Sequence, residues 1–179
     1  MAAMKVLKWI LRIVIALNLC VLAAFALMTI YTFSAEDASM SASRSGAVTE
    51  FVRDKVQPLV ESTETGRKVS EKVKEIVVRV SPYGANWEQN IRKLAHFSEY
   101  FLLATLLYLI LSVLKVPWWL KIILVIGACG MAACLDEMHQ GEVAGRFMAL
   151  SDVIIDTSGA VFSVLVWSVT GKLFKWLAS

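Results

Sequence analysis

Apolar residues group into four stretches along the chain, at about 9–33, 91–114, 118–135 and 150–169. Each is close to or above the roughly 20 mostly apolar residues that a helix needs to cross a bilayer. Polar or turn-forming residues bound the stretches, such as Pro117 before the third and Gly171 after the fourth. The pattern predicts an all-α polytopic membrane protein with four transmembrane helices, in which residues 1–179 form a single membrane domain.

The first stretch has a signal peptide as its competing interpretation. Lys5, Lys8 and Arg12 resemble the basic start of such a peptide. The apolar part of a signal peptide is about 7–15 residues long, and this stretch is longer. The residues around Thr32 and Ala35 also make a poor cleavage site. We therefore expect a transmembrane helix that is retained.

Between the first two stretches, residues 34–90 carry apolar residues at helical spacing in two runs. The runs are Val48, Phe51, Val52, Val56, Leu59 and Val60, and then Val69, Val73, Ile76, Val77 and Val80. Residues 62–66 break the pattern, so two short amphipathic helices are expected, on the external side of the membrane. Their polar faces mix Lys, Arg and Glu, which suits a solvated cap better than attraction to anionic lipid.

The composition agrees with a membrane protein, since 58% of the 179 residues are apolar and 18% are charged, with a mean hydropathy of +0.64. A soluble domain has about 45–50% apolar and about 25% charged residues. The net charge of +3 is unevenly distributed, because every acid falls within residues 36–99 or 136–156. The two chain ends and the connection between the second and third stretches hold only bases: Lys5, Lys8, Arg12, Lys115, Lys121, Lys172 and Lys175.

Short connections rich in Lys and Arg stay in the cytoplasm. The base-only regions therefore predict that both termini are cytoplasmic and that residues 34–90 lie outside. The basic balance reflects membrane topology, so membrane lipids are the expected partners and nucleic acid is not.

Ionisable residues at the ends of the spans are the candidate functional groups, because a charge at mid-bilayer costs roughly 2.5–3.5 kcal/mol on insertion scales. His96 and Glu99 share a helix face, with Arg92 one turn before them. The topology brings the ends of all four spans to one depth, at the external leaflet. The candidate binding residues at this depth are Ser34, Arg92, His96, Glu99, Asp136, Glu137, His139, Gln140, Arg146, Asp152 and Asp156.

Several chemistries fit this group. A network of ion pairs that ties the helices together is the structural alternative. Two histidines with several carboxylates could instead bind a divalent metal, zinc or magnesium, although the chain has no HExxH motif. Ser34 could act as a nucleophile with His96 or His139. A transporter is disfavoured, because the sequence lacks paired halves with helices broken by Gly or Pro.

Three ordered blocks of this sequence resemble the VanZ-like family of bacterial membrane proteins. They are Arg92-Lys93-x-Ala95-His96-Phe97-x-Glu99-Tyr100, then Asp136-Glu137-x-His139-Gln140 with Arg146, then Asp152-x-x-x-Asp156-x-x-Gly159. The resemblance covers about residues 30–165 and implies a multi-span protein of the bacterial cytoplasmic membrane. The family's named member is associated with reduced susceptibility to the glycopeptide antibiotic teicoplanin.

These observations lead to two functional hypotheses. The first is an envelope protein whose outer-leaflet polar pocket binds or organises a lipid-linked or polar headgroup, with Arg146 on an anionic group. The alternative is a membrane-embedded hydrolase or transferase that acts on a lipid headgroup, with or without a divalent metal. Its candidate catalytic residues are His96, Glu99, Asp136 and His139.

Overall fold

The computed structural model describes residues 2–177, and the side chains of residues 4–171; Lys172 and Lys175 lie outside the described side chains. Four helices are long and apolar enough to cross a membrane: α1 (Ala2–Ser34), α5 (Trp87–Val113), α6 (Trp118–Gln140) and α7 (Leu150–Leu177). The all-α fold with four candidate spans is therefore confirmed. Four boundaries differ from expectation, because α1 begins at Ala2, α5 begins at Trp87, α6 continues to Gln140 and α7 continues to Leu177. The polar residues 136–140 thus belong to the last turns of a helix.

The main compact unit comprises residues 2–35 and 96–177. Its buried core is rich in small side chains, which let helix backbones approach closely. They include Ala23, Ala26, Ala104, Cys129, Ala133 and Ala160. Many large apolar side chains point outward, among them Phe25, Met131 and Leu165, which are 70%, 68% and 57% exposed. This inverted surface suits a hydrocarbon solvent.

Helices α5 and α7 approach each other closely at Gly159. A Cβ atom added at Gly159 would collide with the carbonyl oxygen of Phe97 and lie 3.2 Å from the backbone nitrogen of Phe101. One further turn along, the hydroxyls of Thr105 and Ser163 are 2.8 Å apart, and Ser163 is fully buried. Glycine at 159 therefore allows the two backbones to touch. One turn further on, the hydroxyl pair links the same two helices.

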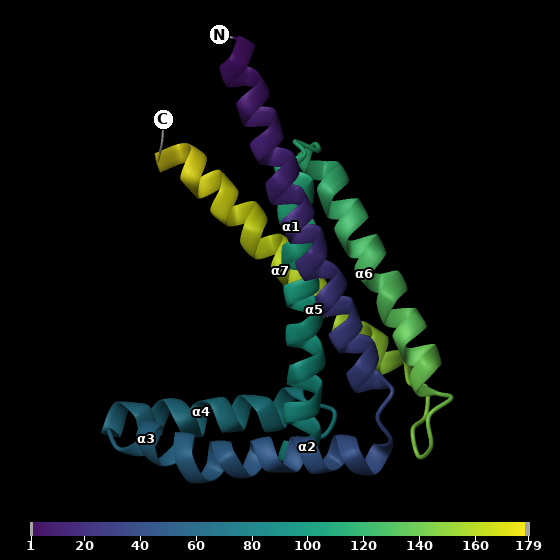
Figure 1. Ribbon diagram of the computed structural model, residues 1–179. Coiled ribbons are helices and arrows are strands. Elements are labelled where there is room, and N and C mark those ends of the chain that lie inside the picture. The colour runs from purple at the N-terminus through teal and green to yellow at the C-terminus, as the bar shows by residue number, and fades with distance from the viewer. Residues whose placement is uncertain (1, 178–179) are drawn as a thin grey trace. The chain divides into compact units, whose positions relative to one another are not determined.

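Helix α6 packs along α7 and also contacts α1, beside which it runs in Figure 1. In the first turn of α6, the side chain of Lys121 contacts α5. Its Nζ donates to the Ser112 hydroxyl at 3.0 Å and lies 4.5 Å from the centre of the Tyr108 ring. This lysine is thereby satisfied near a helix end, which is the usual arrangement for a base close to hydrocarbon.

Residues 36–95 form a second compact unit that contains α2 (Ala38–Phe51), a π-helical turn (Val52–Val56), α3 (Gln57–Glu61) and α4 (Glu64–Val80). The first helical run begins ten residues before the expected apolar stripe, because Asp37 caps it by accepting from the backbone nitrogen of Met40 at 2.8 Å. The π-turn ends two residues before Pro58. Proline lacks a donor and crowds the carbonyl four residues back, so it commonly distorts the helical ladder at this point.

The break at residues 62–66 occurs as expected, and α4 folds back beside the preceding helical run (Figure 1). The Thr63 hydroxyl caps α4 by accepting from the Gly66 nitrogen at 3.0 Å. Glu61 joins the two arms, since its Oε1 accepts from the Ser70 hydroxyl at 2.8 Å and from Lys74 Nζ at 2.9 Å. The two short amphipathic segments thus form a helical hairpin.

Substituting Gly159 with alanine should destabilise the four-helix unit by about 1–3 kcal/mol, because the new methyl group must push α5 away from α7. Thermal unfolding of the purified protein in detergent measures the effect. Gly127→Ala is the matched control, since a Cβ there meets no atom within 4 Å. Equal melting temperatures for the two variants would contradict the close contact.

The pKa of Glu61 is lowered from 4.5 to about 2 by hydrogen bonds from Lys74, Ser70 and Gln57. Because the folded pKa lies below the unfolded one, the carboxylate stabilises the hairpin above about pH 4.5, and this contribution disappears as the pH falls toward about 2. A carboxyl-carbon NMR titration should show Lys74→Ala moving the pKa of Glu61 upward. Lys68→Ala, which removes only the partner of Glu64, should not; an unchanged pKa in Lys74→Ala would refute the assignment.

Candidate functional site

The end of α1, the end of α6 and the loop that follows α6 meet through a hydrogen-bonded polar group. Gln140 Nε2 donates to Asp136 Oδ2 at 2.8 Å and to the Ser34 hydroxyl at 3.3 Å, and all three side chains are buried. Arg146 Nη1 donates to the backbone carbonyl of Ser34 at 3.3 Å. The last carbonyls of a helix lack partners within the helix and attract cations. Arg146 therefore stabilises the end of α1.

Glu137 holds the start of α7. Its Oε1 accepts from the backbone nitrogen of Ala149 at 2.6 Å, immediately before α7 begins at Leu150. The side chain is buried, with only 2% exposed. A carboxylate is favourable at the N-terminal end of a helix, where the backbone N–H groups point outward. This sequence-predicted site residue thus has a structural role in the fold.

A second part of the site comes from α5 and α7. His96 Nδ1 lies 3.8 Å from Asp156 Oδ1 and 3.9 Å from Glu99 Oε2. Asp156 is 2% exposed. Asp136 of α6 joins this group, because ligand atoms of His96, Asp136 and Asp156 all lie within 4.8 Å of one another. Three helices therefore contribute one group each to a compact cluster, which we call the His-Asp-Asp cluster.

Two aromatic residues complete the surroundings of Asp136. The His139 ring stacks on Tyr31 of α1, with centroids 4.6 Å apart and an interplanar angle of 16°. Tyr100 of α5 is fully buried. Neither the Tyr100 hydroxyl nor His139 Nε2 has a hydrogen-bond partner among the described residues. Buried polar atoms are normally satisfied, so both atoms are candidates to meet a ligand or an ordered water.

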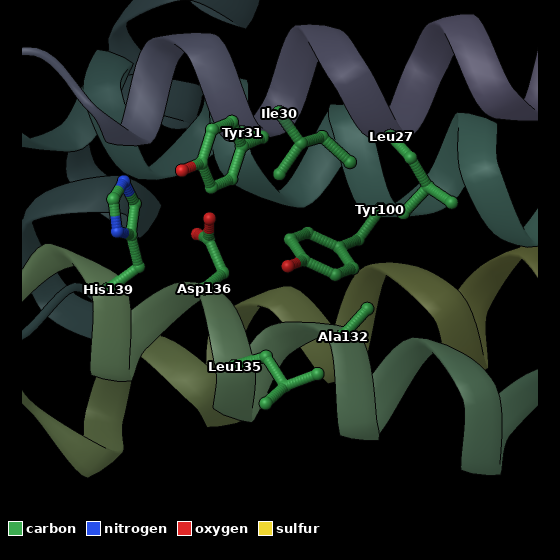
Figure 2. A pocket seen from close by; sticks show the side chains of 8 residues that line it. All are labelled: Leu27, Ile30, Tyr31, Tyr100, Ala132, Leu135, Asp136 and His139. Carbon is green, nitrogen blue, oxygen red and sulfur yellow. The ribbon is translucent and has the colours of Figure 1, made fainter.

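A cavity of about 380 Å³ connects these residues to the apolar part of the unit. Figure 2 shows its lining: Leu27, Ile30 and Tyr31 from α1, Tyr100 from α5, and Ala132, Leu135, Asp136 and His139 from α6. Asp136 and His139 lie at one end, and Leu27 lies toward the other (Figure 2). A second cavity of about 280 Å³ shares Ile30 with the first and has Glu99 in an otherwise mostly apolar wall. The cavities are therefore amphipathic.

Most of the sequence-predicted binding residues lie at this end of the unit, in the contacts described above; Asp152 and Arg92 are the other two. Asp152 lies in the first turn of α7, half-buried, with its carboxylate 3.5 Å from the Ser151 hydroxyl. Arg92 belongs to the unit of residues 36–95 and is not part of the four-helix unit. Whether any of these residues binds a ligand stays a prediction.

The candidate binding residues did not include Tyr31, Tyr100 or Gly159, although Tyr100 and Gly159 stand in the family blocks. Tyr100 follows His96 by four residues, and this helical spacing could have placed it on the same face. Tyr31 precedes Ser34 by three residues on α1, so the same argument applies. No spacing rule indicated Gly159, since its role depends on which backbone it faces.

Acidic groups dominate the electrostatics of this site. Asp136, Glu137 and Asp156 are each at most 7% exposed. Buried carboxylates are costly unless they are protonated, hydrogen-bonded or paired with a cation. Glu137 has its backbone donor and Asp136 has Gln140. The arrangement can therefore hold a cation or exchange protons, next to a cavity that accepts an apolar group.

Four apolar helices and a buried acidic site at one of their ends define an integral membrane protein with an intramembrane polar site. The family model VanZ/LLP1 matches residues 19–174, so the chain belongs to this family. The match includes the last three candidate spans, the part of the first span from residue 19 onward, the insertion between the first two, and every candidate site residue. No curated protein and no solved structure matches the chain.

Replacing Glu137 with glutamine should destabilise the unit by about 1–1.5 kcal/mol, because a charge-assisted bond to the α7 start becomes a neutral one. Thermal unfolding in detergent gives the change. Glu142→Gln is the control, since it alters an exposed carboxylate in the loop after α6. If Glu137→Gln and its control have the same melting temperature, the Ala149 contact contributes no stability.

Proposed function

We propose that this VanZ-family membrane protein binds an amphipathic lipid or lipid-linked molecule at this end of the four-helix unit. The observation that carries the proposal is the 380 Å³ cavity, whose apolar lining leads to Asp136 and His139. Ligand sites are commonly concave, mostly apolar and about 300–1,000 Å³ in volume, with a few convergent polar groups. The cavity meets each of these conditions.

The apolar part suits a hydrocarbon chain that enters from the bilayer. Leu27 and Leu135 line the cavity and are also 43% and 61% exposed on the surface of the unit. Side chains exposed at this depth of a membrane protein face lipid. A lipid can therefore reach the cavity sideways, without passing through water.

The polar end suits a headgroup that carries a phosphate or another anion. Arg146 is half-buried beside the end of α1, and guanidinium groups bind phosphate in a bidentate manner. Asp136 and His139 provide an acceptor and a ring nitrogen for hydroxyl or amine groups of the same headgroup. If both termini are cytoplasmic, as the basic residues indicate, this end lies in the outer leaflet of the bacterial cytoplasmic membrane.

An outer-leaflet lipid site gives a physical route to an effect on teicoplanin susceptibility. Binding or organising lipid-linked envelope material there would change what an external glycopeptide meets, without altering its target chemically. The proposal thus makes the susceptibility effect a consequence of lipid binding.

A second candidate is a hydrolase or transferase that acts on the bound headgroup. His139 favours it, because its Nε2 has no hydrogen-bond partner in the described part of the chain and its ring lines the cavity next to Asp136. A histidine with an adjacent carboxylate can serve as general base. The binding protein and the enzyme would use the same site. They differ in whether the lipid is released intact or with its headgroup altered.

Leu27→Trp should fill the apolar part of the cavity and reduce co-purifying lipid roughly tenfold, equivalent to about 1.4 kcal/mol of binding free energy. Met28→Trp is the matched control, since Met28 is the adjacent residue of α1, is 69% exposed and does not line the cavity. Native mass spectrometry of both variants and the wild type measures the retained lipid.

Equal lipid retention by all three proteins would contradict binding in this cavity. The same spectra distinguish the two candidates after incubation with a labelled lipid. Recovery of the intact lipid supports a binding protein, whereas loss of its headgroup in wild type but not in His139→Gln supports an enzyme.

A further inference from the structure

We infer that the His-Asp-Asp cluster is a binding site for a divalent transition-metal ion, with zinc as the best match. His96 of α5, Asp136 of α6 and Asp156 of α7 present one nitrogen and two oxygen ligand atoms within 4.8 Å of one another. This site would bind a metal ion, whereas the proposed lipid cavity would bind an amphipathic molecule. Asp136 belongs to both.

The ligand set agrees with zinc chemistry. Zinc binds histidine nitrogen at about 2.0–2.1 Å and carboxylate oxygen at about 2.0–2.2 Å, and open zinc sites have three protein ligands. Tetrahedral ligands at these distances are about 3.3–3.5 Å apart. His96 Nδ1 and Asp156 Oδ1 are already at 3.8 Å. Small side-chain rotations therefore bring the cluster to metal geometry. A nitrogen ligand disfavours magnesium and calcium, which prefer oxygen.

Charge provides the second argument. Asp136 is 7% exposed and Asp156 is 2% exposed, so two carboxylates meet in a place that water hardly reaches. Two carboxylates whose oxygens lie within 4.8 Å of each other repel, and a cation bound between them removes that repulsion. A divalent ion balances the charges of both carboxylates, and His96 supplies the third ligand atom.

Tyr100 gives an independent indication of a ligand. Its side chain is fully buried, and its hydroxyl has no hydrogen-bond partner among the residues that the structure describes. Figure 2 shows the hydroxyl end of the ring directed to the side of the cavity where Asp136 lies. Tyr100 follows His96 by one helical turn. A water molecule on the metal would provide the missing partner, which is how buried residues around a metal commonly orient its ligands.

The three ligands are held by rigid elements. Gly159 lies one turn after Asp156 and contacts the backbone of Phe97, which directly follows His96. This close backbone contact thus holds two of the ligands, His96 and Asp156, near each other. Sites that are built on packed helices keep their geometry better than sites on loops.

The test is zinc binding by the full-length protein in detergent, after treatment with a chelator and equilibrium dialysis against zinc. Elemental mass spectrometry should find about one zinc per chain, as expected for one three-ligand site. Asp156→Asn and His96→Gln should each weaken binding at least about tenfold, a loss typical of disturbed metal sites. Glu142→Gln removes an exposed carboxylate outside the cluster and should keep the wild-type affinity.

Wild-type protein provides a readout that does not depend on the folding of variants. Zinc should raise its melting temperature, because an ion that binds only the folded state stabilises it. Absence of stoichiometric zinc in the wild type would overturn the inference and leave the cluster as a proton-sharing ion-pair network. A preference for magnesium over zinc, or equal zinc affinity of wild type and Asp156→Asn, would overturn it as well.

The metal site and the lipid site can fail separately. Leu27→Trp should lose lipid and keep zinc, since Leu27 lies toward the apolar end of the cavity (Figure 2). Zinc binding without lipid retention would refute only the proposed function. Lipid retention without zinc would refute only the metal site.

Discussion

The backbone contact between α5 and α7 at Gly159 is the constraint on which the rest of the four-helix unit depends. Inside a bilayer, helices gain little from apolar burial against each other and associate through close packing and hydrogen bonds. Gly159 allows the approach, and the Thr105 and Ser163 hydroxyls keep the two helices aligned. His96 and Asp156 lie beside this contact, so the same constraint that holds the fold together also determines how near these two side chains come.

Much of this architecture could be predicted from the sequence. The bilayer requires long apolar helices, so hydropathy alone located all four candidate spans. Helix ends were less predictable. The sequence pattern ended the third span at 135, whereas α6 continues to Gln140 because its polar residues are satisfied by other helices. The first insertion helix also began earlier than its apolar stripe, since the Asp37 cap rather than apolar periodicity determines where it starts.

The site could be predicted only in part, because the sequence pattern does not define how each helix is rotated about its axis. Topology places the ends of four helices at one depth, and it correctly brought Ser34, Asp136 and Gln140 into one neighbourhood. Which side chain meets which depends on the rotation of each helix about its axis, and a hydropathy pattern does not define that angle. Glu137 illustrates the difference, because the sequence pattern gave no sign that its Oε1 would accept from the backbone nitrogen of Ala149. Tyr31 and Tyr100 entered the cavity lining for the same reason.

The loop between α6 and α7 is attached at two points, by Glu137 at Ala149 and by Arg146 at the end of α1. These two hydrogen bonds connect the ends of α1 and α6 to the beginning of α7. A rotation of α1 would therefore displace Arg146, and with it the loop that leads into the first turn of α7. The helix nearest the N-terminus contributes no member of the His-Asp-Asp cluster, yet Arg146 ties its end to the loop that leads into α7, the helix that carries Asp156.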